Sequence, residues 1–455
     1  MDEAVFPRNF LKGYPQAVRG EGCFVFTSVG RRYLDASGGA AVVTIGHGVE
    51  EVARAMAEQA GKLAFVHSSQ FHTAAADKLA HRLLMLAPER MRDGGRVFFT
   101  SGGSEAVETA IKMARQYWLE RGEKKRIRVI SRQQSYHGAT LGALGVSGNV
   151  RRREPYAPML AEWGHVAPCF CYRCPLGLKY PECNVDCADE LERLLLRDGS
   201  VDVAAFIFEP VSGATLGAVP PPDGYAQRIA DICRRHGILL IADEVMTGMG
   251  RTGKPFAIDH WGVVPDLIVA GKGIASGYAP LGAVIAAGHV AETFARGTGI
   301  LRHGFTFNSH PVAMAAGNAV LDYIEREKLF ERVESAGRDL RAALEPLRRF
   351  SVVGDVRGLG LLWGIEIVRD PKTHDPYPAD ARVAQRVQED ALEAGVMTYP
   401  IQGCADGERG DHILLAPPFT ITSGMIQMIS GAMERALGDL DKSRNAGTGG
   451  SSALV

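Results

Sequence analysis

Short apolar runs recur through the middle of this chain, and stretches with helical periodicity separate several of them. The runs are Val97–Thr100, Ile127–Ser131, Ala204–Glu209, Ile238–Asp243, Leu267–Ala270 and Leu281–Ala287. Their length and their β-branched and aromatic content are typical of buried strands. Strands that alternate with helices assemble into a mainly parallel sheet with helices on its faces. We therefore predict an α/β domain over residues 51–320.

The two ends of the chain have a different pattern. Residues Val18–Ala36 alternate apolar and polar side chains around glycines, which predicts short antiparallel strands. After about Val320 we expect a long charged helix, followed by a glycine-punctuated strand region over Val352–Val368. We expect a smaller α+β domain over residues 321–440, completed by residues 1–50. The Gly/Ser-rich tail, residues 441–455, has the composition of a disordered end.

Composition narrows the class of protein. The chain has 455 residues, of which 46% are hydrophobic and 23% charged, with a net charge of −1. This balance gives no reason to expect a nucleic-acid or membrane-surface partner. No apolar run approaches the length that spans a bilayer, and the start, Met1-Asp-Glu, lacks the basic residues of a signal peptide. We expect a cytoplasmic protein whose eight cysteines stay reduced.

Lys272 follows the apolar run that ends at Ala270. An ammonium group is costly in an apolar site, so most lysines there extend their charge to water. A desolvated lysine also loses its proton easily, and its free amine can form a Schiff base with an aldehyde cofactor. An earlier run ends in the carboxylate of Asp243. A lysine and an acid at neighbouring strand ends is the arrangement that pyridoxal phosphate (PLP) needs.

Three further segments follow apolar runs. The turn Thr100–Glu105 opens a helix, and its glycines and free N–H groups are suited to a phosphate. Tyr136 offers a ring that could stack on a flat heterocycle. The turn His303–Pro311 carries hydroxyl groups. Each segment alone has an ordinary structural explanation. Together they favour a ligand site, because ligands of α/β sheets bind at the carboxyl ends of the strands.

Four segments together resemble the class III aminotransferases, which are PLP enzymes of fold type I. These segments are Thr100–Ala106, Tyr136–Gly138, Leu240–Gly253 and Ala270–Gly282. The similarity extends from about Gly20 to the last helix. The resemblance implies a large domain with a mainly parallel seven-stranded sheet, a smaller α+β domain, and a homodimer with shared active sites.

The resemblance also implies the roles of residues around the PLP ring. Lys272 forms the internal aldimine and then serves as general acid and base. Asp243 pairs with the pyridinium nitrogen, so that the ring becomes an electron sink. Val245 contacts one face of the ring and Tyr136 the other.

For the rest of the cofactor, the resemblance implies that Gly103 and Ser104 hold the phosphate of PLP. Thr306 reaches the same phosphate from the partner subunit. Glu209 is expected near the cofactor, although a carboxylate that caps a turn at a strand end is an equally good interpretation.

The absence of two residues indicates which keto acid the enzyme accepts. Glutamate-using members of the family carry Gln and Glu three and five residues after the glutamate that corresponds to Glu209, and the second of these masks an active-site arginine. This chain has Ser212 and Ala214 there. The departure resembles the ω-amino acid:pyruvate branch, which favours pyruvate over 2-oxoglutarate as acceptor. Arg409 lies near the position of that branch's carboxylate-binding arginine, although a solvated loop arginine also fits.

Five cysteines are concentrated in one segment without helical or strand periodicity: Cys169, Cys171, Cys174, Cys183 and Cys187. Their spacing resembles that of zinc or iron–sulfur ligands but matches no zinc module that we can name. Buried thiols also pack as small hydrophobic groups. PLP chemistry requires no metal, and we assign none to the active site.

We therefore expect an aminotransferase that moves an amino group from an amine or ω-amino acid to a keto acid by a ping-pong mechanism. The alternative on the same scaffold is an amino-acid racemase or epimerase, which uses the same lysine and cofactor. A non-catalytic binding module built around the cysteines is a third possibility, and the presence of Lys272 and Asp243 argues against it.

Overall fold

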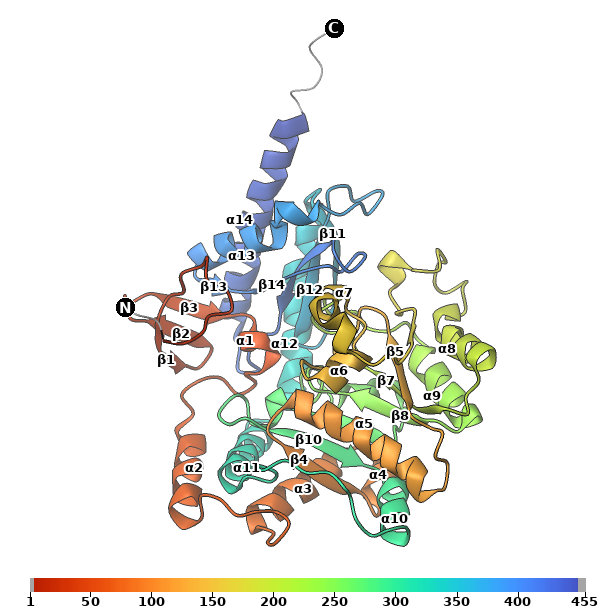
Figure 1. Ribbon diagram of the computed structural model, residues 1–455. Coiled ribbons are helices and arrows are strands. Elements are labelled where there is room, and N and C mark those ends of the chain that lie inside the picture. Colours follow the sequence, from red (N-terminus) through yellow and green to blue (C-terminus); the bar gives the residue numbers. More distant parts are fainter. Residues whose placement is uncertain (1–3, 449–455) are drawn as a thin grey trace.

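The computed structural model describes residues 4–448, whose strands form three sheets (Figure 1). The strands are β1 (Ala17–Glu21), β2 (Phe24–Thr27), β3 (Arg32–Asp35), β4 (Arg96–Thr100), β5 (Arg128–Arg132), β6 (His165–Val166), β7 (Val203–Phe208), β8 (Leu239–Asp243), β9 (Leu267–Ala270), β10 (Gly282–Ala286), β11 (Val353–Leu359), β12 (Leu362–Ile367), β13 (Val396–Met397), β14 (Tyr399–Gln402) and β15 (Asp411–Leu415). The α-helices are α1 (Gly38–Ala41), α2 (Glu50–Lys62), α3 (Ala74–Leu86), α4 (Glu89–Arg92), α5 (Gly103–Glu120), α6 (Leu141–Val146), α7 (Val150–Arg153), α8 (Asp186–Asp198), α9 (Tyr225–His236), α10 (Gly288–Arg296), α11 (Pro311–Arg326), α12 (Leu329–Leu344), α13 (Val383–Glu393) and α14 (Ser423–Thr448).

The large sheet has seven strands in the order β4-β10-β9-β8-β7-β5-β6. Strand β10 runs antiparallel to both of its neighbours, and the other pairs are parallel. Every residue of β7, β8 and β9 is buried, as expected for parallel strands covered on both faces. The six strands expected from the apolar runs are all present, with ends within one residue of the expected ones. The two-residue β6 escaped detection because it is too short to show a pattern.

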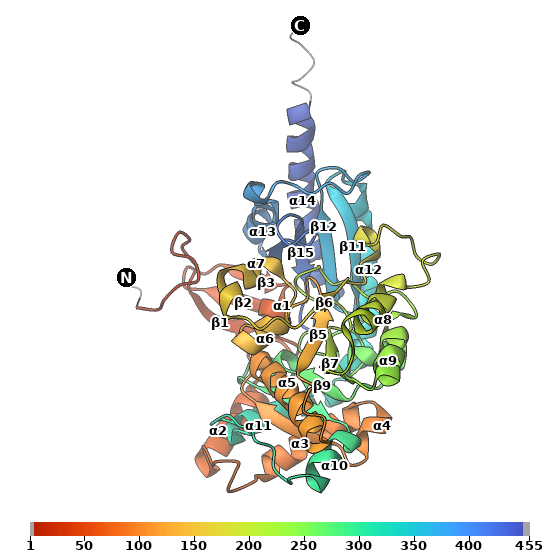
Figure 2. The same cartoon turned by 45° about the vertical axis from the view of Figure 1, so that its right-hand side comes forward.

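Helix α5 covers one face of this sheet (Figure 2). Its apolar side chains, among them Ala110 and Ala114, belong to the same core cluster as Val129, Ile207 and Ile241 of the strands. The helix begins directly after β4. This packing fixes the N-terminus of α5 at the edge of the sheet where β8 and β9 also end.

The smaller sheets lie with α12, α13 and α14 at the other end of the molecule (Figures 1 and 2). One has the antiparallel order β11-β12-β15-β14. The other has the order β1-β2-β3-β13, in which β13 runs parallel to β3 and Val396 pairs with Leu34. This pairing joins the two ends of the chain and is the observation behind our proposal that residues 1–50 and 321–440 form one small domain.

Two details differ from the sequence-based expectation. The long charged helix expected after Val320 is two helices, α11 and α12, separated near Lys328, whose φ is +51°. The expected disordered tail began at residue 441, but α14 continues to Thr448, so that expectation is wrong for residues 441–448. Residues 449–455 lie outside the described part of the chain. Across residues 4–448, no helix has both the length and the apolar character needed to cross a membrane.

Candidate active site

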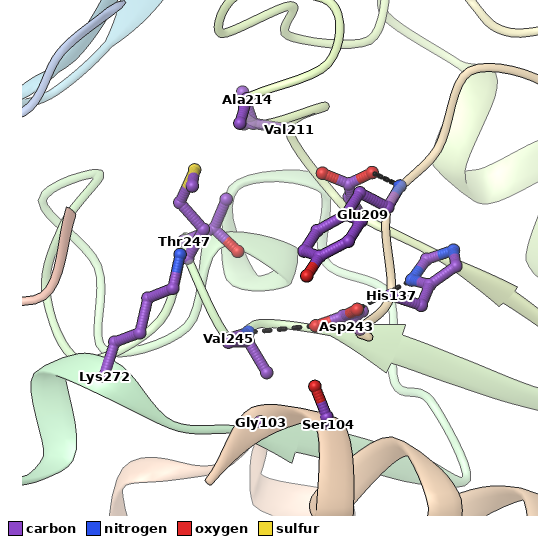
Figure 3. Close-up of a pocket in the computed structure, with 13 residues that line it drawn as sticks. Gly103, Ser104, His137, Glu209, Val211, Ala214, Asp243, Val245, Thr247 and Lys272 are labelled. Carbon is purple, nitrogen blue, oxygen red and sulfur yellow. Dashed lines mark hydrogen bonds and ion pairs between the residues drawn. The ribbon is translucent and has the colours of Figure 1, made fainter. Parts of the chain in front are cut away.

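A cavity of about 180 Å³ opens where the carboxyl ends of β7 and β8 meet the N-terminus of α5 (Figure 3). Seven of the residues expected to bind the cofactor line it: Gly103, Ser104, Tyr136, Glu209, Asp243, Val245 and Lys272. These residues come from widely separated parts of the sequence, and the topology of the sheet brings them together. Ala214, which the sequence analysis used to choose the acceptor, also lines the cavity, and so do four side chains to which sequence reasoning gave no role: His137, Val211, Met246 and Thr247.

Lys272 begins a short 3₁₀ turn, η4 (Lys272–Ile274), two residues after β9 ends. Its φ is +43°, a left-handed conformation that costs free energy in a residue with a side chain and is often found at functional sites. Burial lowers the pKa of its amine to about 8, although the nearby carboxylates Asp243 and Glu209 act in the opposite direction. The neutral, nucleophilic form of this amine is therefore far more populated near neutral pH than in an ordinary lysine.

Asp243 is the last residue of β8 and is buried. One of its carboxylate oxygens, Oδ1, accepts a hydrogen bond from the backbone N–H of Val245 at 3.1 Å, and Oδ2 lies 2.7 Å from Nδ1 of His137 (Figure 3). The other ring nitrogen of His137, Nε2, is buried and has no partner among the described residues. The two contacts fix the carboxylate on the wall of the cavity. In the sequence, His137 directly follows Tyr136 within the segment Tyr136–Gly138. This position was the indication in the sequence that His137 lies at the site.

The N-terminus of α5 forms the opposite wall. Its first-turn N–H groups, including those of Gly103 and Ser104, have no helical acceptor and carry the positive end of the helix dipole. A Cβ atom on Gly103 would lie 2.7 Å from Cγ1 of Val245, so only glycine fits there. Gly138, with a φ of +143°, lets the next residue, Ala139, donate its N–H to Oγ of Ser104 at 3.0 Å.

Glu209, which directly follows β7, has its carboxylate satisfied by backbone groups. Oε1 accepts from the N–H of Tyr136 at 3.1 Å, and Oε2 accepts from the N–H of Gly213 at 2.6 Å. Both interpretations of Glu209 therefore apply, because it caps a turn and also lines the cavity. Through these bonds it holds Tyr136 and the start of the 211–219 loop in place.

The chemistry of this donor set fits PLP. The cavity combines a free helix N-terminus for a phosphate, a neutral-prone amine for an aldehyde, and a fixed carboxylate for a pyridinium nitrogen.

The 211–219 loop forms a third wall and is held by the small domain. Nε2 of His412 lies 2.8 Å from the backbone oxygen of Ala214. Burial and the nearby Arg357 lower the pKa of His412 to about 3, so its ring is neutral and donates this bond through Nε2–H. Arg357 donates to the backbone oxygens of Leu216 and Gly217, the latter at 2.9 Å. Ala214, which lines the cavity, is thus positioned by residues of β11 and β15.

Two predicted residues lie elsewhere. Arg409 is an exposed loop residue whose Nε donates to Asp406 at 2.7 Å, and it is not part of the cavity lining. The geometry therefore agrees with the solvated-loop interpretation of Arg409. Thr306 is exposed and also lies outside the lining. Its assignment to a partner's phosphate stays a prediction.

The cysteine segment is separate from this cavity. Cys169 is buried, Cys171 is exposed, and the other three are partly buried. Burial and neighbouring thiols raise the pKa of Cys171 to about 11 and that of Cys187 to about 12, which favours protonated thiols. Among the described residues, no group of three or more Cys, His, Asp or Glu side chains is arranged to hold a metal ion. The metal interpretation therefore has no geometric support.

Comparison with known proteins gives a consistent result. The family model of the class III aminotransferases matches residues 9–437. The uncharacterized aminotransferase YodT of Bacillus subtilis is 38% identical over 97% of this chain and 99% of its own length. An (S)-enantioselective ω-transaminase from Thermomicrobium roseum is 37% identical and superposes with a TM-score of 0.89 over 96% of each chain.

A PLP-bound amine transaminase from an uncultivated Pseudomonas species is also 37% identical, with a TM-score of 0.89 over 96% of this chain and 98% of its own. These matches confirm the expected fold and the expected cofactor. The chain belongs to the class III aminotransferases, PLP-dependent enzymes of fold type I.

Proposed function

We propose that this aminotransferase takes an amino group from an amine or ω-amino acid and passes it to pyruvate by a ping-pong mechanism. The observation that carries the proposal is Ala214, which lines the cavity where glutamate-using relatives carry a masking glutamate. The carboxylates that do line the cavity, Glu209 and Asp243, are each held by hydrogen bonds and are not available to mask an arginine. A short keto acid with one carboxylate suits such a site.

The chain's own residues divide the work. PLP, when bound, supplies an electron sink that stabilises negative charge on the substrate carbon. Lys272, whose amine has a lowered pKa, accepts the proton from that carbon and returns it. Asp243, fixed by His137 and Val245, supplies a negative charge opposite a pyridinium nitrogen. The N-terminus of α5 binds the phosphate.

We further propose a homodimer with shared active sites. Phe65 and Phe307 form an exposed edge-to-face pair with ring centroids 5.9 Å apart, and Phe307 directly follows Thr306 in the sequence. Exposed aromatic groups of this kind are typical of protein interfaces. We also propose that the enzyme works in the cytoplasm, and the eight free cysteines are consistent with a reducing compartment.

The test is a comparison of pyruvate and 2-oxoglutarate as acceptors with one good amine donor. We expect kcat/KM to favour pyruvate by about a hundredfold, since an unpaired buried carboxylate costs several kcal/mol. Equal or better use of 2-oxoglutarate would show that the acceptor is wrong. Loss of optical activity from a chiral amino acid without any keto acid would instead favour the racemase alternative.

A further inference from the structure

The short helix α7 holds Arg152 against Tyr136, a residue of the cavity lining to which Arg152 itself does not belong. Asn149, which is buried, caps this helix, and its Oδ1 accepts the backbone N–H of Arg152 at 3.2 Å. Nδ2 of Asn149 donates to Gln134 at 3.3 Å, which anchors the cap itself. One buried side chain, itself anchored by Gln134, thus fixes the backbone N–H of Arg152.

The guanidinium group of Arg152 stacks on an aromatic residue of the cavity wall. Its Cζ lies 4.2 Å from the centroid of the Tyr136 ring. Tyr136 lines the cavity, and its backbone is held by Glu209. An arginine that stacks on a ring keeps its N–H groups free at the edge of the guanidinium plane, where they can bind a carboxylate in bidentate fashion.

No carboxylate among the described residues neutralises Arg152, although its side chain is partly buried. Of the arginines nearby in the sequence or loop, Arg151 donates to Gln402 and Arg409 donates to Asp406, whereas Nε of Arg153 is buried without a partner among the described residues. The positive charge of Arg152 is also close enough to Lys272 to contribute to the lowering of its pKa. A partly buried arginine without a counter-ion, within electrostatic range of the reactive lysine, is suited to an anionic substrate group.

We infer that Arg152 binds the carboxylate of the substrate. The ligands of this subsite are short carboxylates: the keto-acid acceptor and any amine donor that carries a carboxylate. Amines without a carboxylate make no use of it. This inference rests on the proposed function for its choice of substrates, and it assigns to Arg152 the role that sequence comparison suggested for Arg409.

The test compares the holoenzyme with the variant Arg152→Gln. We expect kcat/KM for pyruvate to fall about 10- to 100-fold, as for loss of charge-assisted hydrogen bonds. The half-reaction with 1-phenylethylamine, which has no carboxylate, should change less than about twofold in the absence of an acceptor. The variant Arg151→Gln, which removes an adjacent exposed arginine, is the matched control and should behave like the wild type.

A second measurement is independent of turnover. Propionate has the carboxylate of pyruvate but no carbonyl group, so it binds without reacting. Its inhibition constant should rise in Arg152→Gln by the same factor as the loss for pyruvate, and Arg152→Lys should restore part of the affinity. Unchanged propionate and pyruvate binding in Arg152→Gln would overturn the inference, as would a loss seen in Arg409→Gln instead. If the wild type reacted with no amine, the proposed function would fail, while propionate binding would still test Arg152.

Discussion

Nδ1 of His137 lies 2.7 Å from Oδ2 of Asp243, and both side chains are buried. This contact links the loop that carries Tyr136 to the end of β8. Because Nε2 of His137 has no partner among the described residues, the ring's one hydrogen bond is to the acid. The position of the carboxylate therefore depends on a residue more than one hundred positions earlier in the sequence.

The variant Asp243→Asn should slow proton removal from the substrate by orders of magnitude. It keeps the shape of the side chain but removes the charge, and loss of a preorganised charge partner commonly costs several kcal/mol. Single-turnover kinetics with an amine donor would measure the effect. We expect His137→Phe, which leaves the charge but removes its hydrogen bond, to cause a smaller loss. Unchanged single-turnover rates in Asp243→Asn would exclude this role.

Covalent attachment of PLP to Lys272 in the apoenzyme should depend on pH. Burial lowers the pKa of this amine to about 8, so the neutral form becomes dominant above that pH. The rate should rise about tenfold per pH unit below pH 8 and level off above it. Stopped-flow absorbance after mixing apoenzyme with PLP would record the profile. The variant Lys272→Ala should still bind PLP through its phosphate, but without turnover. A rate that continues to rise to pH 10 would show that the amine is not perturbed.

Thr306→Ala should weaken retention of PLP if the hydroxyl group reaches the partner's phosphate. One hydrogen bond to a charged group is worth roughly 1.5–3 kcal/mol, which corresponds to about a ten- to hundredfold change in the dissociation constant. Equilibrium dialysis of PLP gives that constant. Thr298→Ala, which loses a hydroxyl bound to Glu120 of its own chain, is the control. An active enzyme that sediments as a monomer at micromolar concentration would contradict the shared site.

His412→Leu should alter substrate binding at a distance. The substitution removes the Nε2–H donor and leaves the backbone oxygen of Ala214 without its partner, at a cost of about 1–3 kcal/mol. We expect KM for amine donors to rise several-fold, while the dissociation constant of PLP stays within about twofold. A variant that loses thermal stability but keeps the wild-type KM would show that His412 only supports the fold.

Glu244 should make the enzyme less stable as pH rises. Burial raises the pKa of its carboxyl group to about 7, although hydrogen bonds from Thr247 and from the N–H of Ile258 oppose this. The folded state thus holds the proton more tightly than the unfolded state, so the stability that Glu244 contributes is fully present below pH 4.5 and is lost as the pH rises to about 7. The loss is at most about 3 kcal/mol.

The amide side chain of the variant Glu244→Gln does not titrate, so its Tm should fall less than that of the wild type between pH 5 and pH 8. Glu331→Gln, which changes an exposed carboxylate on α12, is the matched control. Identical pH dependence in wild type and Glu244→Gln would show that the carboxyl group is not perturbed.

The sequence by itself determined the elements of the large sheet and the main chemical groups of the site. Runs such as Leu267–Ala270 are apolar throughout because both faces of a parallel strand are buried, and this pattern is visible without any structure. Lys272 and Asp243 were noticeable because a charged group at the end of a buried apolar run is costly unless it is paired or has a function. The Gly-rich turn at Gly103 indicated a phosphate site for a similar local reason.

Only the tertiary structure decided which side chains complete the site. It paired His137 with Asp243, placed His412 against a carbonyl 198 residues away, placed Arg409 with Asp406 outside the cavity, and stacked Arg152 on Tyr136. Periodicity and turn chemistry depend on neighbouring residues in the chain, so a single sequence contains them. Contacts between distant side chains depend on how sheets and helices pack, and the residues that make these contacts carry no local pattern that distinguishes them.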